Sequence, residues 1–399
     1  MNKIECLLQT LAPKGVEFRK LGEVINILKG KQLNKELLLD YGEYPVMNGG
    51  IHASGYWNEY NTDYPKIIIS QGGSAGYVNY MTSKFWAGAH CYVIELNSEK
   101  LNYKYLYYFL KNSQIILMKS QFGACIPALN KTDIETLTIP IPPLEVQQEI
   151  VKILDAFTEL TTELTTELKA RKKQYEYYQN MLLDFNDIHS NHKDAKERLA
   201  QKTYPKHLKT LLQTLAPKGV EFRKLGEVLE YDQPNKYCVT SKEFDKSYPT
   251  PVLTAGKTFI LGYTNEKDNI YQASKNAPVI IFDDFTTATQ WVDFPFKVKS
   301  SAMKILFSKN PTINIRFIFF YMQTIPYNIS GEHTRQWISR YSKITIPIPP
   351  LEVQQEIVKI LDQFLALTTD LQTGIPAEIE ARKKQYEYYR EKLLTFKPL

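Results

Sequence analysis

Apolar side chains recur at alternating intervals of three and four residues through the middle of the chain, starting at Leu154. This is the a and d pattern of heptad repeats, and it predicts a long helix whose apolar stripe packs against a second helix. Thr161 and Arg171 interrupt the stripe with polar groups. The full stripe is Leu154, Phe157, Thr161, Leu164, Leu168, Arg171, Tyr175, Tyr178, Leu182 and Phe185.

A matching stripe runs later in the chain, and we expect the two stripes to pack on each other. Four extra residues around Gly374-Ile375-Pro376 fall within it, and an insertion of four nearly preserves a heptad register. Pro376 predicts a break or kink there because proline removes a backbone donor. The second stripe is Leu361, Phe364, Thr368, Leu371, Ile379, Arg382, Tyr386, Tyr389, Leu393 and Phe396.

The sequence IPIPP precedes both stripes, at residues 139–143 and 346–350. Proline fixes its own φ and holds the residue before it extended, so these segments predict stiff exits into helices that begin at Leu144 and Leu351. A helix over 150–185 measures about 54 Å, against about 34 Å for one turn of duplex DNA. An ordinary coiled-coil dimerisation stalk explains the periodicity equally well.

Three segments occur twice, in the same order, and flank two stretches without comparable identity, residues 21–137 and 225–344. Two copies of roughly 200 residues are too long and too few for a solenoid, so they indicate a duplicated domain-plus-helix unit with pseudo-twofold character. A constant frame around unlike inserts indicates one structural task done twice and one recognition task in two versions. The identical pairs are Leu7–Val24 with Leu211–Val228, Thr138–Asp155 with Thr345–Asp362, and Ala170–Tyr178 with Ala381–Tyr389.

The patterns predict an α/β (α+β) fold in which two variable domains with curved sheets are separated by a pair of long helices. Residues 186–210 are rich in Lys, Asn, Asp and His with little apolar pattern, and we expect a linker there. His189 and His192 lack a third ligand nearby, which argues against a metal site. The expected divisions are 1–143 and 211–350 for the variable domains with their constant leading segments, 144–185 and 351–399 for the helices, and 186–210 for the linker.

Composition describes a globular chain of 399 residues, 43% hydrophobic and 23% charged, with room for two or three cores. Its longest apolar runs are far shorter than the roughly 20 residues that a bilayer crossing needs. Four scattered cysteines without CxxC spacing fit neither a disulfide framework nor a zinc site, and we expect a cytoplasmic location. A net charge of +6 is compatible with a polyanionic partner without demonstrating one.

Together the repeated segments resemble the specificity subunit of type I restriction-modification systems: PKGVEFRKLGEV ahead of each variable stretch, the IPIPPLEVQQEIVKILD exits, the tandem TTEL unit at 157–168 and ARKKQYEYY on each helix. The resemblance covers essentially the whole chain. It departs at the insertion around Gly374, which makes the two helices unequal.

The resemblance implies two target recognition domains that each read one half of a split, asymmetric duplex DNA site, with an antiparallel helix pair that sets the distance between them. It implies two methylation subunits that carry S-adenosylmethionine, and restriction subunits that use ATP and Mg²⁺. It also implies that the number of TTEL units changes the tolerated spacer, and each unit adds roughly 6 Å of helix.

Side chains suited to base edges and phosphates gather in polar, glycine-bearing loops of both variable stretches. Gln71 follows an apolar strand and is suited to pair with adenine, although the same residues also describe a tight hairpin turn. Thr254 to Thr258 resemble a phosphate loop but lack its first glycine, where Pro251 stands. The candidate DNA contacts are Asn48, Ser70, Gln71, Gly72, Gly73, Ser74, Lys119 and Gln121 in the first domain, and Thr254, Lys257, Thr258, Thr286, Thr287, Thr289, Gln290, Lys299, Arg335 and Gln336 in the second, with Lys297, Ser300 and Trp337 as further donors or aromatics.

Motifs for catalysis are missing from the sequence. The adenine methyltransferase tetrapeptide Asn-Pro-Pro-aromatic, the GxxxxGK[ST] loop and HExxH do not occur. Asp283-Asp284 lacks the Glu-x-Lys of a nuclease site but leaves a metal site open as an alternative. We therefore expect a non-catalytic subunit without its own cofactor. Two other interpretations remain: an adaptor whose two domains bind proteins, and a silent specificity cassette that binds DNA poorly without partners.

Overall fold

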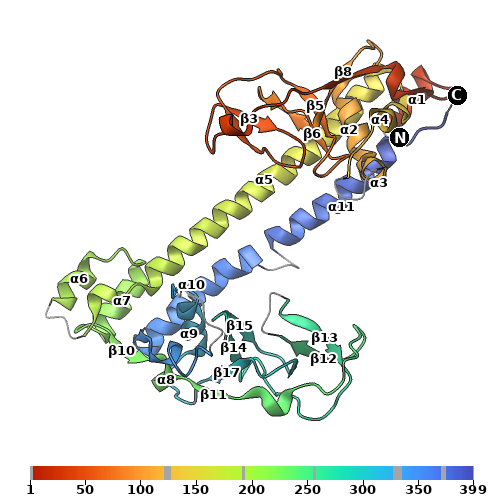
Figure 1. The fold of residues 1–399 in the computed structure, drawn as a ribbon. Coiled ribbons are helices and arrows are strands. Elements are labelled where there is room, and N and C mark those ends of the chain that lie inside the picture. The colour runs from red at the N-terminus through yellow and green to blue at the C-terminus, as the bar shows by residue number, and fades with distance from the viewer. Residues whose placement is uncertain are drawn as a thin grey trace. The chain divides into compact units, whose positions relative to one another are not determined.

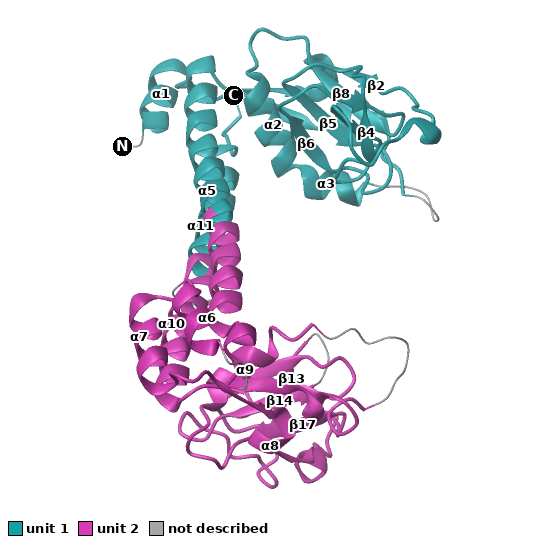
Figure 2. Cartoon of the chain, turned by 90° about the vertical axis from the view of Figure 1, so that its left-hand side faces the viewer, with its two compact units in different colours: residues 1–166, 377–399 teal, residues 167–376 magenta. Residues whose placement is uncertain are grey.

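The computed structural model describes residues 3–120, 127–190, 194–254, 258–326, 335–369 and 374–398 (Figure 1). The chain divides into two compact units. Unit 1 comprises residues 1–166 and 377–399, and unit 2 comprises residues 167–376 (Figure 2). Unit 2 is therefore inserted, in sequence, within unit 1.

Unit 1 contains three sheets and helices on one side of its largest sheet. The largest sheet is antiparallel with the order β2-β8-β5-β6, the second has the order β4-β3-β7, and the smallest pairs β1 with β9. Its elements are α1 (Lys3–Leu11), β1 (Glu17–Lys20), β2 (Ile25–Lys29), β3 (Tyr44–Met47), β4 (Gly55–Trp57), β5 (Lys66–Ser70), β6 (Val78–Met81), β7 (Trp86–Ala87), β8 (Cys91–Leu96), α2 (Tyr103–Asn112), α3 (Gln114–Lys119), α4 (Lys131–Glu135), β9 (Thr138–Ile141) and the first part of α5 (Leu144–Leu183).

Unit 2 repeats this topology although its variable stretch has a different sequence. Its sheets have the orders β11-β17-β14-β15, β13-β12-β16 and β10-β18, which correspond strand for strand to those of unit 1. Its elements are α6 (Ala195–Gln201), α7 (Lys206–Leu215), β10 (Glu221–Lys224), α8 (Leu225–Val228), β11 (Glu230–Asp232), β12 (Thr250–Leu253), β13 (Ile260–Thr264), β14 (Val279–Asp283), β15 (Thr289–Val292), β16 (Lys297–Val298), β17 (Met303–Phe307), α9 (Ile315–Met322), β18 (Thr345–Ile348) and α10 (Leu351–Thr369), and α11 (Ile375–Leu393) continues from it into unit 1.

Strands β5 and β14 are continuous apolar runs because both of their faces are buried. Successive side chains of a strand point to opposite faces. Ile67 and Ile69 of β5 therefore enter the main core with α2, while Ile68 enters a smaller core under the second sheet. In unit 2, Ile280 and Ile281 divide between two cores in the same way. The predicted α/β (α+β) class with two sheet-containing domains is confirmed.

The constant segments pair with each other in both units. Strand β1 pairs with β9, and β10 with β18, in the same antiparallel register, so each IPIPP exit begins as a strand. The backbone N–H of Val16 donates to the Lys397 carbonyl at 3.1 Å, and that of Val220 donates to the Ile188 carbonyl at 2.7 Å. Each unit thus joins the start of one sequence copy to the end of the other.

A buried glutamine of the constant frame fastens each variable domain to its long helix. The Gln147 side chain accepts a hydrogen bond from the Asn102 N–H at 2.7 Å and donates to the Lys100 and Pro142 carbonyls. Gln354 makes the equivalent bonds in unit 2, with the Asn314 N–H at 2.8 Å. Both glutamine side chains are fully buried, which explains why the same residue serves two unlike domains.

Each unit contains one antiparallel helix pair with one helix from each copy, as Figures 1 and 2 show. In unit 1, Phe157 of α5 stacks on Tyr389 of α11 with ring centroids 5.4 Å apart. In unit 2, Tyr178 of α5 stacks on Phe364 of α10 at 4.9 Å. Every described residue of the two predicted stripes is buried or half-buried, so the predicted packing of the stripes is confirmed.

Two sequence expectations need comment. Helix α10 ends at Thr369 and α11 begins at Ile375, with Pro376 in its first turn, and residues 370–373 between them lie outside the described residues. Residues 186–210 are not a bare linker: they contain a short 3-10 helix, α6 and the start of α7, and Leu199, Tyr204 and Leu208 lie in the core of unit 2. Their apolar residues are too sparse to form a recognisable period.

Among the described residues, no helix combines the length and the apolar composition that a bilayer crossing requires.

Candidate nucleic-acid interface

In unit 1, loops that the sequence marks separately meet at one end of the sheets. The Ser70 hydroxyl donates to the Gly50 carbonyl at 2.8 Å, which ties the loop after β5 to the loop after β3. The Gln71 N–H donates to the His90 carbonyl at 2.9 Å, and the Gln71 carbonyl accepts from the Leu129 N–H at 2.8 Å. The candidate residues near Asn48 and Ser70 therefore belong to one surface. We call the loop of residues 71–77 between β5 and β6 the first hairpin loop.

Within this surface, some candidates build the loops and others face solvent. Ser70 is buried, and the Asn48 side chain accepts from the His90 N–H, so these two shape the surface instead of offering free donors. The Oε1 atom of Gln71 is also buried. Recognition of adenine requires this end of the side chain, which therefore does not face solvent. Gly72 is also buried, whereas Gly73 and Ser74 are exposed.

Lys119 lies at the end of α3 and is exposed beside the first hairpin loop. A Cβ placed on Gly76 would lie 2.7 Å from the Met118 backbone nitrogen, so the loop and α3 are in close contact. Gln121 lies outside the described residues. His90 was not singled out from the sequence, yet it is exposed between Gly49 and Gly72. Its only sequence signal is its place in a short Gly-Ala-His turn between two strands.

Unit 2 presents the equivalent end of its sheets with different side chains. Thr254 follows β12 as Asn48 follows β3, and the Lys299 N–H donates to the Leu253 carbonyl at 2.8 Å. Thr258 and Lys299 are exposed, and the Lys299 ammonium lies 5.4 Å from the Phe244 ring centroid. Lys257 lies outside the described residues. We call residues 284–288, between β14 and β15, the second hairpin loop.

Both hairpin loops hold a non-glycine residue in the left-handed region. Ser74 has φ 77° and Thr287 has φ 61°, and each lies four residues beyond the last residue of the preceding strand. Such conformations cost about 1–3 kcal/mol and persist where the surrounding structure enforces them, often at functional sites. Thr286 is exposed in the second hairpin loop and Gln290 is exposed on β15, while Thr287 and Thr289 are half-buried.

The two aspartates at the end of β14 make structural contacts, and one buried oxygen of the Asp284 carboxylate has no hydrogen-bond partner among the described residues. The Asp283 carboxylate accepts from the Phe285 and Thr286 N–H groups, as in a turn. The Asp284 carboxylate accepts from the Trp337 N–H at 2.8 Å and lies 3.5 Å from the buried Lys304 ammonium. These contacts leave little support for the alternative metal site, and among the described residues no cluster of three His, Cys, Asp or Glu could hold a metal.

Several candidates in the second domain are buried. Gln336 and Trp337 lie beneath the surface, because the Gln336 N–H and the Trp337 N–H fix this segment to Asp284. Lys297 is 1% exposed and pairs with Glu266 at 2.7 Å. These three side chains are therefore corrected from contact candidates to structural groups, whereas Arg335 and Ser300 are exposed. Burial raises the pKa of the Cys91 thiol to about 12.

Comparison with known proteins gives a match to each half of the duplicated chain. The family described as type I restriction modification DNA specificity domain matches the chain twice, over residues 13–174 and 217–381. The type I restriction enzyme EcoR124I/EcoR124II specificity subunit of Escherichia coli is 55% identical over 188 residues, which span 45% of either chain. A provisionally named type I restriction enzyme specificity subunit of Haemophilus influenzae is 31% identical over 99% of both chains.

Among solved structures, the type I restriction-modification S subunit of M. genitalium has the same fold, with a TM-score of 0.66 and 21% identity over 95% of this chain and 96% of that chain. The two family matches fall on the two copies, and each contains one variable domain and its exit helix. This chain therefore belongs to the family of type I restriction-modification specificity subunits.

Proposed function

We propose that the chain recognises duplex DNA for a type I restriction-modification complex and reads a split, asymmetric site with its two variable domains. The observation that carries this proposal is the matched pair of hairpin loops. The two domains have the same strand order, yet the equivalent loop residues differ: Ser74 in one corresponds to Thr287 in the other. The candidate contacts with exposed side chains remain predictions.

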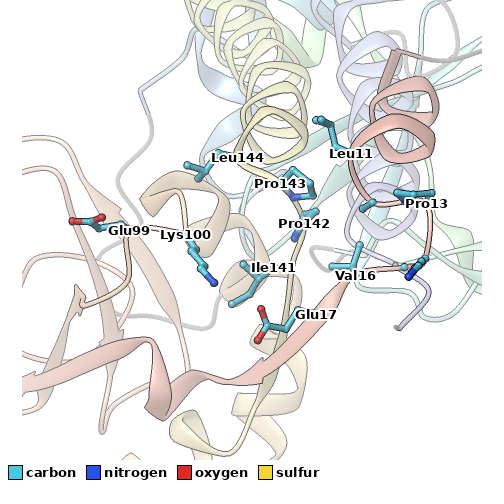
Figure 3. A pocket seen from close by; sticks show the side chains of 13 residues that line it. Leu11, Pro13, Val16, Glu17, Glu99, Lys100, Ile141, Pro142, Pro143 and Leu144 are labelled. Atoms are coloured by element: carbon cyan, nitrogen blue, oxygen red, sulfur yellow. The ribbon is translucent and has the colours of Figure 1, made fainter.

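The constant segments favour docking of the same partner at two places. In unit 1 they line a cavity of about 680 Å³, in which Leu11 and Leu144 lie near the Pro142-Pro143 exit (Figure 3). Leu11 and its duplicate Leu215 are both exposed although they are apolar. Identical exposed apolar positions in both copies fit two methylation subunits, to which we assign S-adenosylmethionine and the methyl transfer. Restriction subunits would then supply ATP- and Mg²⁺-dependent cleavage.

Salt dependence separates DNA reading from the protein-binding adaptor. We expect the affinity of the chain for mixed-sequence duplex to fall steeply with salt, with a log–log slope of about −0.9 for every phosphate neutralised. Lys299→Met removes one exposed cation of the second domain and is expected to reduce the slope by about one. Fluorescence anisotropy between low and moderate salt measures both slopes. A flat dependence for the wild-type chain would favour the adaptor.

Methylome sequencing tests the split site directly in cells that express the chain with its methylation subunit. Exchange of residues 21–137 for the corresponding stretch of another specificity subunit is expected to change only one half of the methylated motif. Deletion of one TTEL unit, residues 161–164, is expected to change only the gap, since roughly 6 Å of helix approaches two base-pair steps. A silent cassette would give no motif, and one contiguous motif would refute the two-domain assignment.

A further inference from the structure

The strand that leaves the first hairpin loop is held by two side chains from the helices. Val78 begins β6, directly after the loop, and is fully buried. Its backbone N–H donates to the Gln114 side-chain oxygen at 3.0 Å, and its carbonyl accepts from the Lys111 ammonium at 2.8 Å. The Lys111 ammonium also donates to the same Gln114 oxygen at 2.8 Å. The three groups form a closed set of hydrogen bonds.

This set takes the place of a neighbouring strand. Strand β6 is at the edge of its sheet, with β5 on one side only. Val78 is opposite Ile69, and the adjacent Ser70 N–H bonds the Tyr77 carbonyl. Since hydrogen-bonded and non-bonded pairs alternate along an antiparallel ladder, the Val78 peptide groups point away from β5. Buried peptide groups need partners, and Gln114 and Lys111 supply both.

Lys111 is also in contact with the loop itself. Its ammonium lies 4.1 Å from the centroid of the Tyr77 ring, the last residue of the first hairpin loop. Burial, together with the nearby Arg390 charge, lowers the pKa of Lys111 to about 8. Arg390 of α11 in turn donates to the Asn112 side chain at 3.2 Å. The set therefore connects the loop to the constant helix within unit 1.

The second domain has a different residue at the equivalent place. Asn102 and Asn314 cap α2 and α9 in the same manner, which aligns Lys111 with Gln323. Gln323 is exposed at the end of α9. This difference provides a matched control, because the same substitution is possible at two equivalent positions of one chain.

We propose that Lys111 and Gln114 are positioning residues that fix the first hairpin loop and thereby set the stringency with which the first domain reads its half-site. The inference rests on the proposed function, since the loop must contact DNA for its position to affect sequence choice. Neither side chain is assigned a contact with DNA. Each acts through the backbone of Val78 and, for Lys111, through Tyr77.

The experiment compares Lys111→Met and Gln323→Met in the full chain, each expressed with its methylation subunit and analysed by methylome sequencing. For Lys111→Met, we expect methylation at sites with one mismatch in the first half to rise about tenfold relative to the perfect site, while mismatches in the second half stay excluded. Gln323→Met is expected to leave both ratios unchanged. Lys111→Arg keeps a cationic donor and is expected to restore most of the discrimination.

Methylation at mismatched sites relative to the perfect site, compared between the two half-sites, distinguishes a positioning role from a simple loss of stability. If Lys111→Met lowers methylation at all sites in proportion, the residue is only structural and the proposal fails. If Lys111→Met does not accumulate, Gln114→Met provides the same test, because it removes the acceptor of the Val78 N–H and leaves the cation. If the wild-type chain gives no split motif, the proposed function fails. If it does, and neither variant alters the first half, only the positioning role fails.

Discussion

Replacement of Glu266 with alanine is expected to lower the free energy of unfolding of the second variable domain by about 3–5 kcal/mol, because it leaves a buried lysine without its counter-charge. Lys297 is 1% exposed, and its ammonium lies 2.7 Å from the Glu266 carboxylate. The other Glu266 oxygen accepts from the backbone N–H groups of Thr240 and Ser241 at 2.9 and 2.8 Å. Glu266 thus ties the segment before β12 to the segments around β13 and β16.

The same carboxylate gives the stability of this domain a dependence on pH. Burial works to raise the pKa of Glu266, but hydrogen bonds from Lys297, Ser241 and Thr240 outweigh it and hold the pKa at about 2, against an ordinary value of 4.5. A depressed carboxylate pKa contributes stability above the unfolded value and loses it as pH falls toward the folded value. The stability difference between wild type and Glu266→Gln is therefore expected to be full above pH 4.5 and to shrink toward pH 2.

Urea unfolding followed by tryptophan fluorescence measures these changes. Trp57 and Trp86 replaced by phenylalanine leave Trp291 and Trp337, both in unit 2, as the reporters. Glu230→Ala is the control, since Glu230 also pairs with a lysine, at 2.8 Å, but both partners are more than half exposed. Its loss is expected to stay below about 1 kcal/mol. Equal losses for the two variants would contradict the buried-pair argument.

A Gly49→Ala variant is expected to destabilise the first domain by about 3 kcal/mol and to abolish recognition of its half-site. Gly49 has φ +82°, which alanine adopts only with strain. A Cβ there would also press against the Gly72 carbonyl oxygen, closer than Cβ atoms approach backbone. The Gly72 carbonyl oxygen belongs to the backbone and cannot swing away as the end of a flexible side chain could. Room for the added Cβ therefore requires that the loops after β3 and β5 move apart.

Gly50→Ala separates the two causes, because Gly50 has nearly the same φ, +80°, but its Cβ would lie 3.4 Å from the nearest heavy atom. We expect about 1 kcal/mol for this variant. Hydrogen exchange of peptides 44–57 and 66–81 during thermal unfolding measures the local loss of stability. Methylome sequencing measures recognition of the first half-site. Similar losses for both alanine variants would show that backbone strain alone, and not loop contact, governs this surface.

Local repetition explains what the sequence predicted well. The helix stripes follow from a heptad period that is complete within each segment, and Pro376 lies in the first turn of α11, where a helix tolerates its ring. The polar loops near Asn48, Ser70 and Thr286 follow apolar strands, so the sequence alone predicted that these loops lie at strand ends. The convergence of the Asn48 and Ser70 loops into one surface of unit 1 could not be predicted, because it depends on the strand orders β4-β3-β7 and β2-β8-β5-β6.

Burial of charged and polar side chains explains the misassigned residues. Lys297 and Gln336 have the composition expected of DNA contacts, but long-range partners, Glu266 for one and the Asp284 backbone for the other, hold them inside. Residues 186–210 lack an apolar period, yet Tyr204 and Leu208 lie in a core that also contains residues of α9 and α10, more than a hundred residues later in the sequence. Sequence patterns of short range carry no information on such partners.

The insertion of unit 2 within unit 1 determines the order in which the chain can fold during synthesis. Residues 167–376 form one continuous unit, so all of them are synthesised before the last residues that unit 1 needs. Unit 1 is completed later, because Tyr389, which stacks on Phe157, and the Lys397 carbonyl, which accepts from the Val16 N–H, are made more than two hundred residues after their partners. Until then the α5 stripe next to Phe157 is uncovered, and a nascent chain is exposed to association through that stripe.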